Sequence, residues 1–131
     1  MKREIITISE DGVITIPSAT TAPILMRDFE IAELFGVYSP TIKAAIKAVL
    51  KSGAVAPDYT HGGVVIGKSL LPDYFGLDMI TAIAFRIHSP EAQVFRELIL
   101  SRLSAVSKPI SRPVFIQINS DKDKLVNQLI N

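Results

Sequence analysis

The chain of 131 residues contains no cysteine. This absence excludes disulfide bonds, thiolate nucleophiles and cysteine-ligated metals, and it is compatible with a reducing cytoplasm, where we expect the protein to act. Histidine is also scarce, since His61 and His88 are the only two in the sequence. A metal site would therefore depend on carboxylates, and the sequence shows no cluster of them. We expect no metal, no cofactor and no enzymatic activity.

Long apolar runs are missing as well. No stretch approaches the ~20 residues that a membrane-spanning helix needs, and the first residues, MKREIITIS, lack the apolar core of a secretion signal. Hydrophobic residues make up 48% of the chain and charged residues 21%, which is typical of a folded protein rather than a disordered one. We therefore expect no membrane partner, one domain over residues 1–107, and a small C-terminal appendage over residues 108–131.

A large excess of either charge is absent too, because 14 basic and 13 acidic residues leave a net charge of +1. Low net charge disfavours strong DNA binding by a monomer, since phosphate contacts supply most of the non-specific affinity. The distribution of the basic residues nevertheless allows DNA binding. Lys43, Lys47 and Lys51 recur every four residues, which places them along one stripe of a helix. Phosphates would respond to such a local patch rather than to the net charge.

Residues 26–52 are predicted to form two amphipathic helices joined by a tight turn. In the first helix, apolar residues recur at helical spacing from Phe29 to Phe35. Gly36 ends this run, and glycine is the residue that most easily adopts a positive φ.

The second helix is predicted over residues 39–50, with Ser39 as its N-cap and Pro40 at its first helical position. Two short helices across a glycine turn, the second apolar inside and basic outside, are the elements of a helix-turn-helix. In that motif the second helix enters the major groove of DNA. The alternative is an ordinary αα-corner with a solvated lysine face.

Two β-hairpins are predicted on either side of these helices. Residues 5–8 and 13–16 are β-branched runs that flank Asp11-Gly12, a strong turn signal. Residues 54–68 are predicted to form strand, turn and strand, with the turn at residues 61–63. A hairpin directly after a recognition helix is the wing of a winged helix, although a plain connector remains the alternative.

The letters of a phosphate-binding loop, G-x-x-x-x-G-K-S, occur at residues 62–69. Such a loop needs flexible residues in its middle and a helix N-terminus after it. Residues 64–66 are instead the stiff strand formers Val, Val and Ile, and Pro72 would cut short any helix that began at Ser69. We interpret the match as coincidence and expect no nucleotide hydrolysis.

Two further helices are predicted in the second half of the chain. Residues 77–87 are apolar on nearly every side, which predicts a buried helix. Ser89 and Pro90 then begin another helix as its N-cap and first residue. Residues 108–131 are predicted to add a strand and a short helix.

The arginines of these helices have separate expected roles. Arg86 is the charged residue of the apolar helix, and we expect it to reach the helix end or a carboxylate such as Glu91 or Glu97 rather than a ligand. Arg96 and Arg102 are expected to point outward or toward a partner.

Two stretches of the chain, residues 31–53 and 74–103, share residues with a known family. In the later stretch these are Phe85-Arg86-Ile87-His88-Ser89 and Phe95-Arg96, and in the earlier one Ala32, Glu33, Leu34, Phe35, Val37, Thr41, Ile42, Ile46, Lys47, Lys51 and Gly53. The stretches resemble the RhuM-type virulence-associated proteins, a bacterial family often carried on mobile elements. The later stretch also resembles the amino-terminal domains of phage antirepressor and Bro-type proteins. The resemblance implies DNA binding and supplies no catalytic residues.

The chain departs from the family pattern at two places. Pro90-Glu91 stands where the family tends to have basic residues, which argues against a phosphate contact at that point. Lys43-Ala44-Ala45 replaces longer side chains that could read base edges.

We therefore expect an α+β protein with a winged helix-turn-helix core, an N-terminal hairpin, two further helices and a C-terminal strand-helix tail. Its expected function is to bind double-stranded DNA as a transcriptional regulator, in the form of a homodimer joined through the N-terminal hairpin or the C-terminal tail. The alternative is a protein–protein assembly module on the same scaffold. The residues expected to contact DNA are Tyr38, Ser39, Pro40, Thr41, Lys43, Ala44, Lys47, Lys51, His61 and Lys68.

Overall fold

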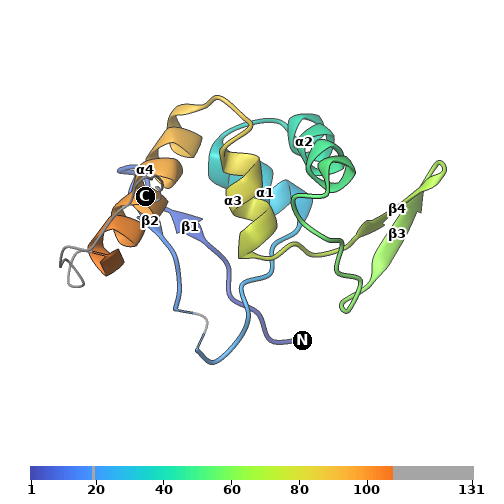
Figure 1. Ribbon diagram of the computed structural model, residues 1–131, viewed down its shortest axis with the longest axis horizontal. Coiled ribbons are helices and arrows are strands. Elements are labelled where there is room, and N and C mark those ends of the chain that lie inside the picture. Colours follow the sequence, from blue (N-terminus) through green and yellow to red (C-terminus); the bar gives the residue numbers. More distant parts are fainter. Residues whose placement is uncertain (19, 108–131) are drawn as a thin grey trace, which may run out of the picture. The chain divides into compact units, whose positions relative to one another are not determined.

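The structure is a computed structural model that describes residues 1–18 and 20–107. Within these residues the fold is α+β, with four helices and two antiparallel sheets of two strands each (Figure 1). The chain divides into a compact unit over residues 1–97 and a second unit that starts at Leu98. The predicted strand and helix of residues 108–131 lie outside the described residues, and the predicted boundary after residue 107 stays a prediction.

The helices and strands alternate in two groups along the chain. In order they are β1 (Thr7–Ile8), β2 (Ile14–Thr15), α1 (Asp28–Phe35), α2 (Ser39–Ser52), β3 (Gly63–Ile66), β4 (Ser69–Pro72), α3 (Leu77–Ala84) and α4 (Pro90–Ser107). The predicted N-terminal hairpin is confirmed in a shorter form, because β1 and β2 pair antiparallel around the Asp11-Gly12 turn.

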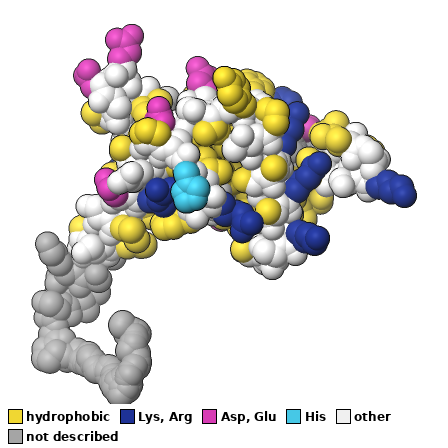
Figure 2. Space-filling view, turned by 90° about the horizontal axis from the view of Figure 1, so that it is seen from above, with side chains coloured by type: hydrophobic (Ala, Val, Ile, Leu, Met, Phe, Trp, Pro, Cys, Tyr) yellow, Lys and Arg dark blue, Asp and Glu magenta, His cyan; other side chains and the backbone are white. Residues whose placement is uncertain are grey.

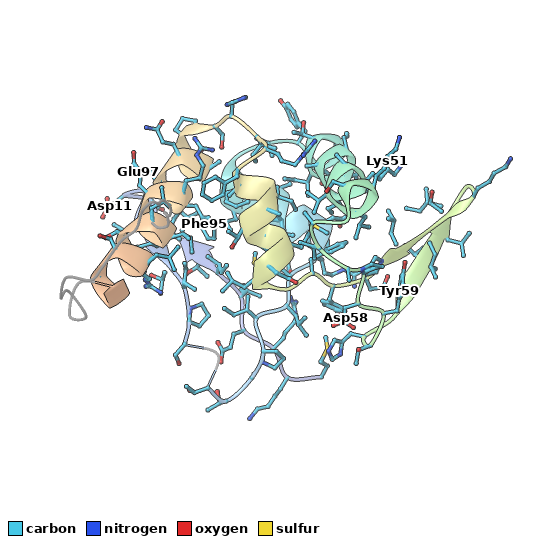
Figure 3. All side chains as sticks on the ribbon, in the orientation of Figure 1. Asp11, Lys51, Asp58, Tyr59, Phe95 and Glu97 are labelled. Carbon is cyan, nitrogen blue, oxygen red and sulfur yellow. The ribbon has the colours of Figure 1, made fainter. Side chains whose placement is uncertain are left out.

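The core of the first unit is built from one apolar face of each helix. Phe35 of α1 and Phe95 of α4 meet edge-on with ring centroids 5.4 Å apart, and neither ring is exposed. Figure 3 shows Phe95 pointing inward from α4. Ile42 of α2 and Ile80 of α3 are also fully buried, which is why these two helices pack against each other.

The turn between α1 and α2 depends on a glycine, as the sequence predicts. Gly36 has φ +66°, and the N–H of Val37 donates to the carbonyl of Ala32 across 3.0 Å, which closes the last turn of α1. The helix α2 begins at Ser39, so the predicted N-cap is wrong by one residue: Tyr38 has the extended backbone of the cap, and its side chain makes no cap hydrogen bond. Gly53 ends α2 with φ +78°.

The start of α1 is fixed by an ion pair that reaches back to the N-terminal segment. Both Nη atoms of Arg3 donate to the two carboxylate oxygens of Glu30, at 2.6 and 3.0 Å, and the backbone N–H of Arg27 donates to the same carboxylate. The Arg3 guanidinium and the Arg27 N–H hold the pKa of Glu30 below its usual value. Phe29, predicted to face the core, is 54% exposed instead, with the Arg27 guanidinium against its ring.

The second hairpin forms with a different register from the predicted one. Its strands are β3 and β4, with Val64 opposite Leu71 and Val65 opposite Leu70, so that Gly67 and Lys68 form the turn. Gly67 has φ +62°, which a two-residue turn of this kind favours.

This register also bears on the match to a phosphate-binding loop at residues 62–69. Ser69 begins β4 rather than a helix, so no helix N-terminus follows the glycines to receive phosphates.

The helix predicted over residues 77–87 is shorter in the structure. It ends at Ala84, and Phe85 is 52% exposed in the turn that follows. The reason is Arg96, whose Nη1 donates to the carbonyls of Ala84 and Ile87 at 2.7 and 3.1 Å and so caps the end of α3. The prediction that Arg96 points outward or toward a partner is therefore wrong: Arg96 reaches the helix end, one of the positions predicted for Arg86, and Arg86 is exposed instead.

The start of α4 agrees with the prediction. The Ser89 hydroxyl accepts a hydrogen bond from the backbone N–H of Ala92 at 3.0 Å, and Pro90 is the first residue of the helix.

Candidate nucleic-acid interface

The helix α2 has one buried and one open face. Ile42, Ile46 and Val49 are at most 1% exposed, and they pack against α1 and α3. At 3.6 residues per turn, Lys47 and Lys51 lie on the opposite side of the helix, and both are exposed. Figure 3 shows Lys51 pointing away from the body of the protein. The lysine stripe is therefore free of cover in the part of the chain that the structure describes.

Figure 2 looks down on the side of the protein where α2 lies in Figure 1, and Lys and Arg side chains gather over that side. Interactions with neighbouring acids distinguish the members of the lysine stripe. Lys43 sits at its edge, and its Nζ lies 3.8 Å from Oδ2 of Asp28 on α1. No ion pair of Lys47 or Lys51 occurs within the described residues.

Asp28 and Asp73 line a groove with Lys43 and Arg27, between α2 and the β3–β4 hairpin. Negative charge beside Lys43 opposes the approach of a phosphate there. Sequence reasoning missed this because Asp28 and Lys43 lie on different helices. The signal available was an acidic residue in the first turn of the preceding helix, which is common and specifies no partner.

The remaining predicted contact residues of α2 are open to solvent to different degrees. Tyr38 is 84% exposed in front of the helix, and Ser39 is partly covered. The first turns expose Pro40, Thr41 and Ala44. None of these three carries a side-chain amide or guanidinium, the groups that bind base edges with two hydrogen bonds.

The two other predicted contact residues, Lys68 and His61, lie at opposite ends of the β3–β4 hairpin. Lys68 lies exposed in the β3–β4 turn, at the end of a hairpin that extends away from the helices in Figure 1. His61 precedes β3 and is therefore at the base of the hairpin rather than in its turn, where the sequence analysis placed it. Its ring meets the Tyr74 ring edge-on with centroids 6.5 Å apart.

A carboxylate, that of Asp58, lies near His61. The carboxylate of Asp58 accepts hydrogen bonds from the hydroxyl and the N–H of Thr60, and together with the nearby His61 these lower the pKa of Asp58. An ionised carboxylate beside His61 disfavours a phosphate at the same place. A contact between His61 and DNA stays a prediction, with the Asp58 carboxylate opposing it.

Arg86 is an exposed cation that was not among the predicted contacts. Arg86 lies in the turn between α3 and α4, and its side chain makes no hydrogen bond or ion pair with any described residue. The sequence could not reveal this, because an arginine within an apolar run is more often paired than free.

Other kinds of site find little support in the described part of the chain. No group of three or more His, Asp or Glu residues there could hold a metal ion. None of the helices described is long and apolar enough to cross a membrane. The chain matches no family model, no curated protein and no solved structure.

Proposed function

We propose that the protein binds double-stranded DNA through α2, with α1 and α2 as a helix-turn-helix and the β3–β4 hairpin as its wing. The observation that carries the proposal is the outward position of Lys47 and Lys51 on a helix whose opposite face is buried. Both ammonium groups can meet phosphates without breaking an ion pair among the described residues. Lys68 adds a third exposed cation on the next element of the chain.

The exposure along α2 suggests how the helix would lie on a duplex. Recognition helices contact base edges with their N-terminal residues, which here include Tyr38, Thr41 and Ala44. Lys47 and Lys51 follow in the C-terminal half, on one stripe of the helix, where they would hold phosphates. Lys43 would contribute less because Asp28 lies beside it.

A monomer with three or four phosphate contacts binds weakly at physiological salt. We therefore propose that the protein acts as a homodimer that places two copies of α2 on neighbouring turns of the duplex. A role as a transcriptional regulator of bacterial or mobile-element origin rests on the RhuM-type resemblance of residues 31–53 and 74–103.

The proposal is tested by fluorescence anisotropy with a random-sequence duplex over a range of salt concentrations. The double variant Lys47→Ala/Lys51→Ala should weaken binding at least tenfold at low salt. It should also reduce the slope of log K against log salt by about two units, because each lost phosphate contact removes about 0.9. An unchanged slope would contradict the assignment.

Lys2→Ala/Lys68→Ala provides a matched variant with the same loss of charge. Lys2 is exposed in the N-terminal segment, which lies on the opposite side of Figure 1 from α2. Only Lys68 belongs to the proposed interface, so this variant should reduce the slope by about one unit. Equal effects of the two double variants would mean that net charge, rather than the α2 surface, determines binding.

A specific observation favours a second candidate, an assembly module. Val65 is 71% exposed and Leu70 is 49% exposed. They pair directly across β3 and β4, so both side chains lie on the same face of the hairpin. An exposed apolar pair on a protruding hairpin is typical of a protein–protein contact.

Light scattering separates this candidate from DNA binding. If the hairpin face joins copies of the chain, Val65→Ser/Leu70→Ser should lower the measured mass, and Lys47→Ala/Lys51→Ala should leave it unchanged. A monomer in all three samples would exclude assembly through this hairpin face.

A further inference from the structure

The turn between α3 and α4, residues 85–88, presents three side chains to solvent. Phe85 is 52% exposed, and Arg86 and His88 are exposed as well. Ile87, between them, is only 7% exposed and anchors the turn in the core. An aromatic ring, a guanidinium and an imidazole are thus displayed together on a short segment that the core holds in place.

The backbone of this turn is fixed on both sides. Arg96 donates from one Nη atom to the carbonyls of Ala84 and Ile87, which bracket the turn. The N–H groups of Arg86 and Ile87 both donate to the carbonyl of Ile83, at 2.9 and 3.2 Å. Because these bonds set the backbone conformation, little backbone entropy would be lost when Arg86 bound a ligand.

The turn lies on the same side of the fold as α2. Residues that follow it reach the α1–α2 turn, since the Glu91 carboxylate lies 2.8 Å from where a Cβ on Gly36 would be. The helices α2 and α3 also pack against each other. Figure 1 shows the α3–α4 connection and α2 on the same edge of the protein, and Figure 2 views that edge from outside.

We propose that Arg86 is a second phosphate-binding element of the DNA interface, on the side of α2 away from the β3–β4 hairpin. This inference rests on the proposed function. A guanidinium suits the role because its planar donors can bind two oxygens of one phosphate. The Arg86 guanidinium has no partner to give up among the described residues, whereas Lys43 has Asp28. In this arrangement the duplex contacts three elements: the hairpin, α2 and the α3–α4 turn.

Glu91 is the acidic residue that opposes this contact. Its carboxylate lies against Gly36, in the first turn of α4 and close to the proposed path of the phosphates. Arg86 therefore offers a local positive charge rather than a broad basic surface. A contact of this kind positions the duplex and adds about one unit to the salt dependence.

The test uses the full chain, a random-sequence duplex and salt-titrated anisotropy. Arg86→Ala should weaken binding about three- to tenfold at low salt and reduce the slope by about 0.9. Arg86→Lys, which keeps the charge but loses the fork of donors, should recover most of the slope. The matched control is Lys2→Ala, which removes the same charge on the opposite side of the fold and should leave the slope unchanged.

The results distinguish this inference from the proposed function. If Lys47→Ala/Lys51→Ala reduces the slope while Arg86→Ala behaves like Lys2→Ala, then the second element is refuted and DNA binding by α2 stands. If neither variant differs from Lys2→Ala, or if no duplex binds, both proposals fail. Thermal melting of each variant should match that of the parent chain, because the Arg86 side chain makes no contact that the fold depends on in the described residues.

Discussion

Replacing Gly36 with alanine should destabilise the fold through two separable effects. The first is conformational, because Gly36 has φ +66° and an L-residue in this region costs roughly 1–2 kcal/mol. A smaller unfolded-state entropy for alanine offsets about 0.4–1 kcal/mol of this. The second is steric, since the new Cβ would lie 2.8 Å from the carboxylate carbon and both oxygens of Glu91.

The steric cost should be modest, because all three atoms belong to the free end of a flexible side chain. Moving Glu91 out of its preferred rotamer costs roughly 0.5–1.5 kcal/mol. Gly53 separates the two effects: it ends α2 with φ +78°, and nothing lies within 4 Å of where its Cβ would be. Gly53→Ala should therefore show the conformational cost alone, about 1 kcal/mol, and Gly36→Ala about 0.5–1.5 kcal/mol more.

Urea unfolding of the two alanine variants, alone and combined with Glu91→Ala, measures both effects. In the Glu91→Ala background, Gly36→Ala should cost no more than Gly53→Ala, since the obstructing carboxylate is gone. Equal costs in the parent background would refute the contact between Glu91 and the α1–α2 turn. That result would also remove the main link between the α3–α4 turn and the proposed interface.

Three further outcomes follow from the two ion pairs and from the hydrogen bonds that Arg96 donates to backbone carbonyls. Glu30→Gln should cost roughly 1–2 kcal/mol at pH 7, because the contact with Arg3 is a two-bond charged pair. Since the folded-state pKa of Glu30 is lowered, that contribution is complete above its ordinary value of about 4.5 and is lost as the pH falls through the lowered pKa. The urea midpoints of parent and variant should therefore converge as the pH falls below about 4.5. Asp28→Asn should tighten duplex binding about two- to fivefold in anisotropy, because it releases Lys43 from its ion pair, and should change stability by less than about 1 kcal/mol. Unchanged affinity would show that Lys43 lies outside the interface. Arg96→Met should lower stability by roughly 2–3 kcal/mol in urea unfolding, because it leaves two carbonyl groups without their donor; a neutral effect would refute its capping role.

Elements specified by short-range signals were predicted well. The bounds of α2 follow from proline near its start and glycine after its end, and the observed helix runs only two residues past the predicted one. Ser89 caps α4 as expected. The outward lysine stripe also follows from periodicity alone, since the apolar residues of α2 leave one side for it.

Features that depend on distant partners were not predicted. The turn of the second hairpin was placed at residues 61–63, but the pairing of Val64 with Leu71 moves it to Gly67-Lys68. Both positions contain glycine, so turn chemistry alone could not choose between them. The register is distinguished instead by the burial of Leu71, which sequence-local signals do not show. In the same way, Arg96 of α4 donates to a carbonyl at the end of α3, which is shorter than the predicted helix. The periodicity within residues 77–87 carries no information about this contact.

Acidic neighbours explain how a chain with a net charge of +1 could still present a surface for DNA. Asp28 and Asp73 confine the positive charge at one edge of α2, and Glu91 opposes it beside the α1–α2 turn. What remains is a narrow row in which Lys47 and Lys51 face outward. Such a row limits the number of phosphates that one copy can neutralise and therefore keeps its non-specific affinity low. Under the proposed function, useful affinity then requires a second copy of the chain. It also requires a duplex whose groove geometry fits the small side chains Pro40, Thr41 and Ala44. Recognition would therefore depend more on DNA shape than on hydrogen bonds to bases.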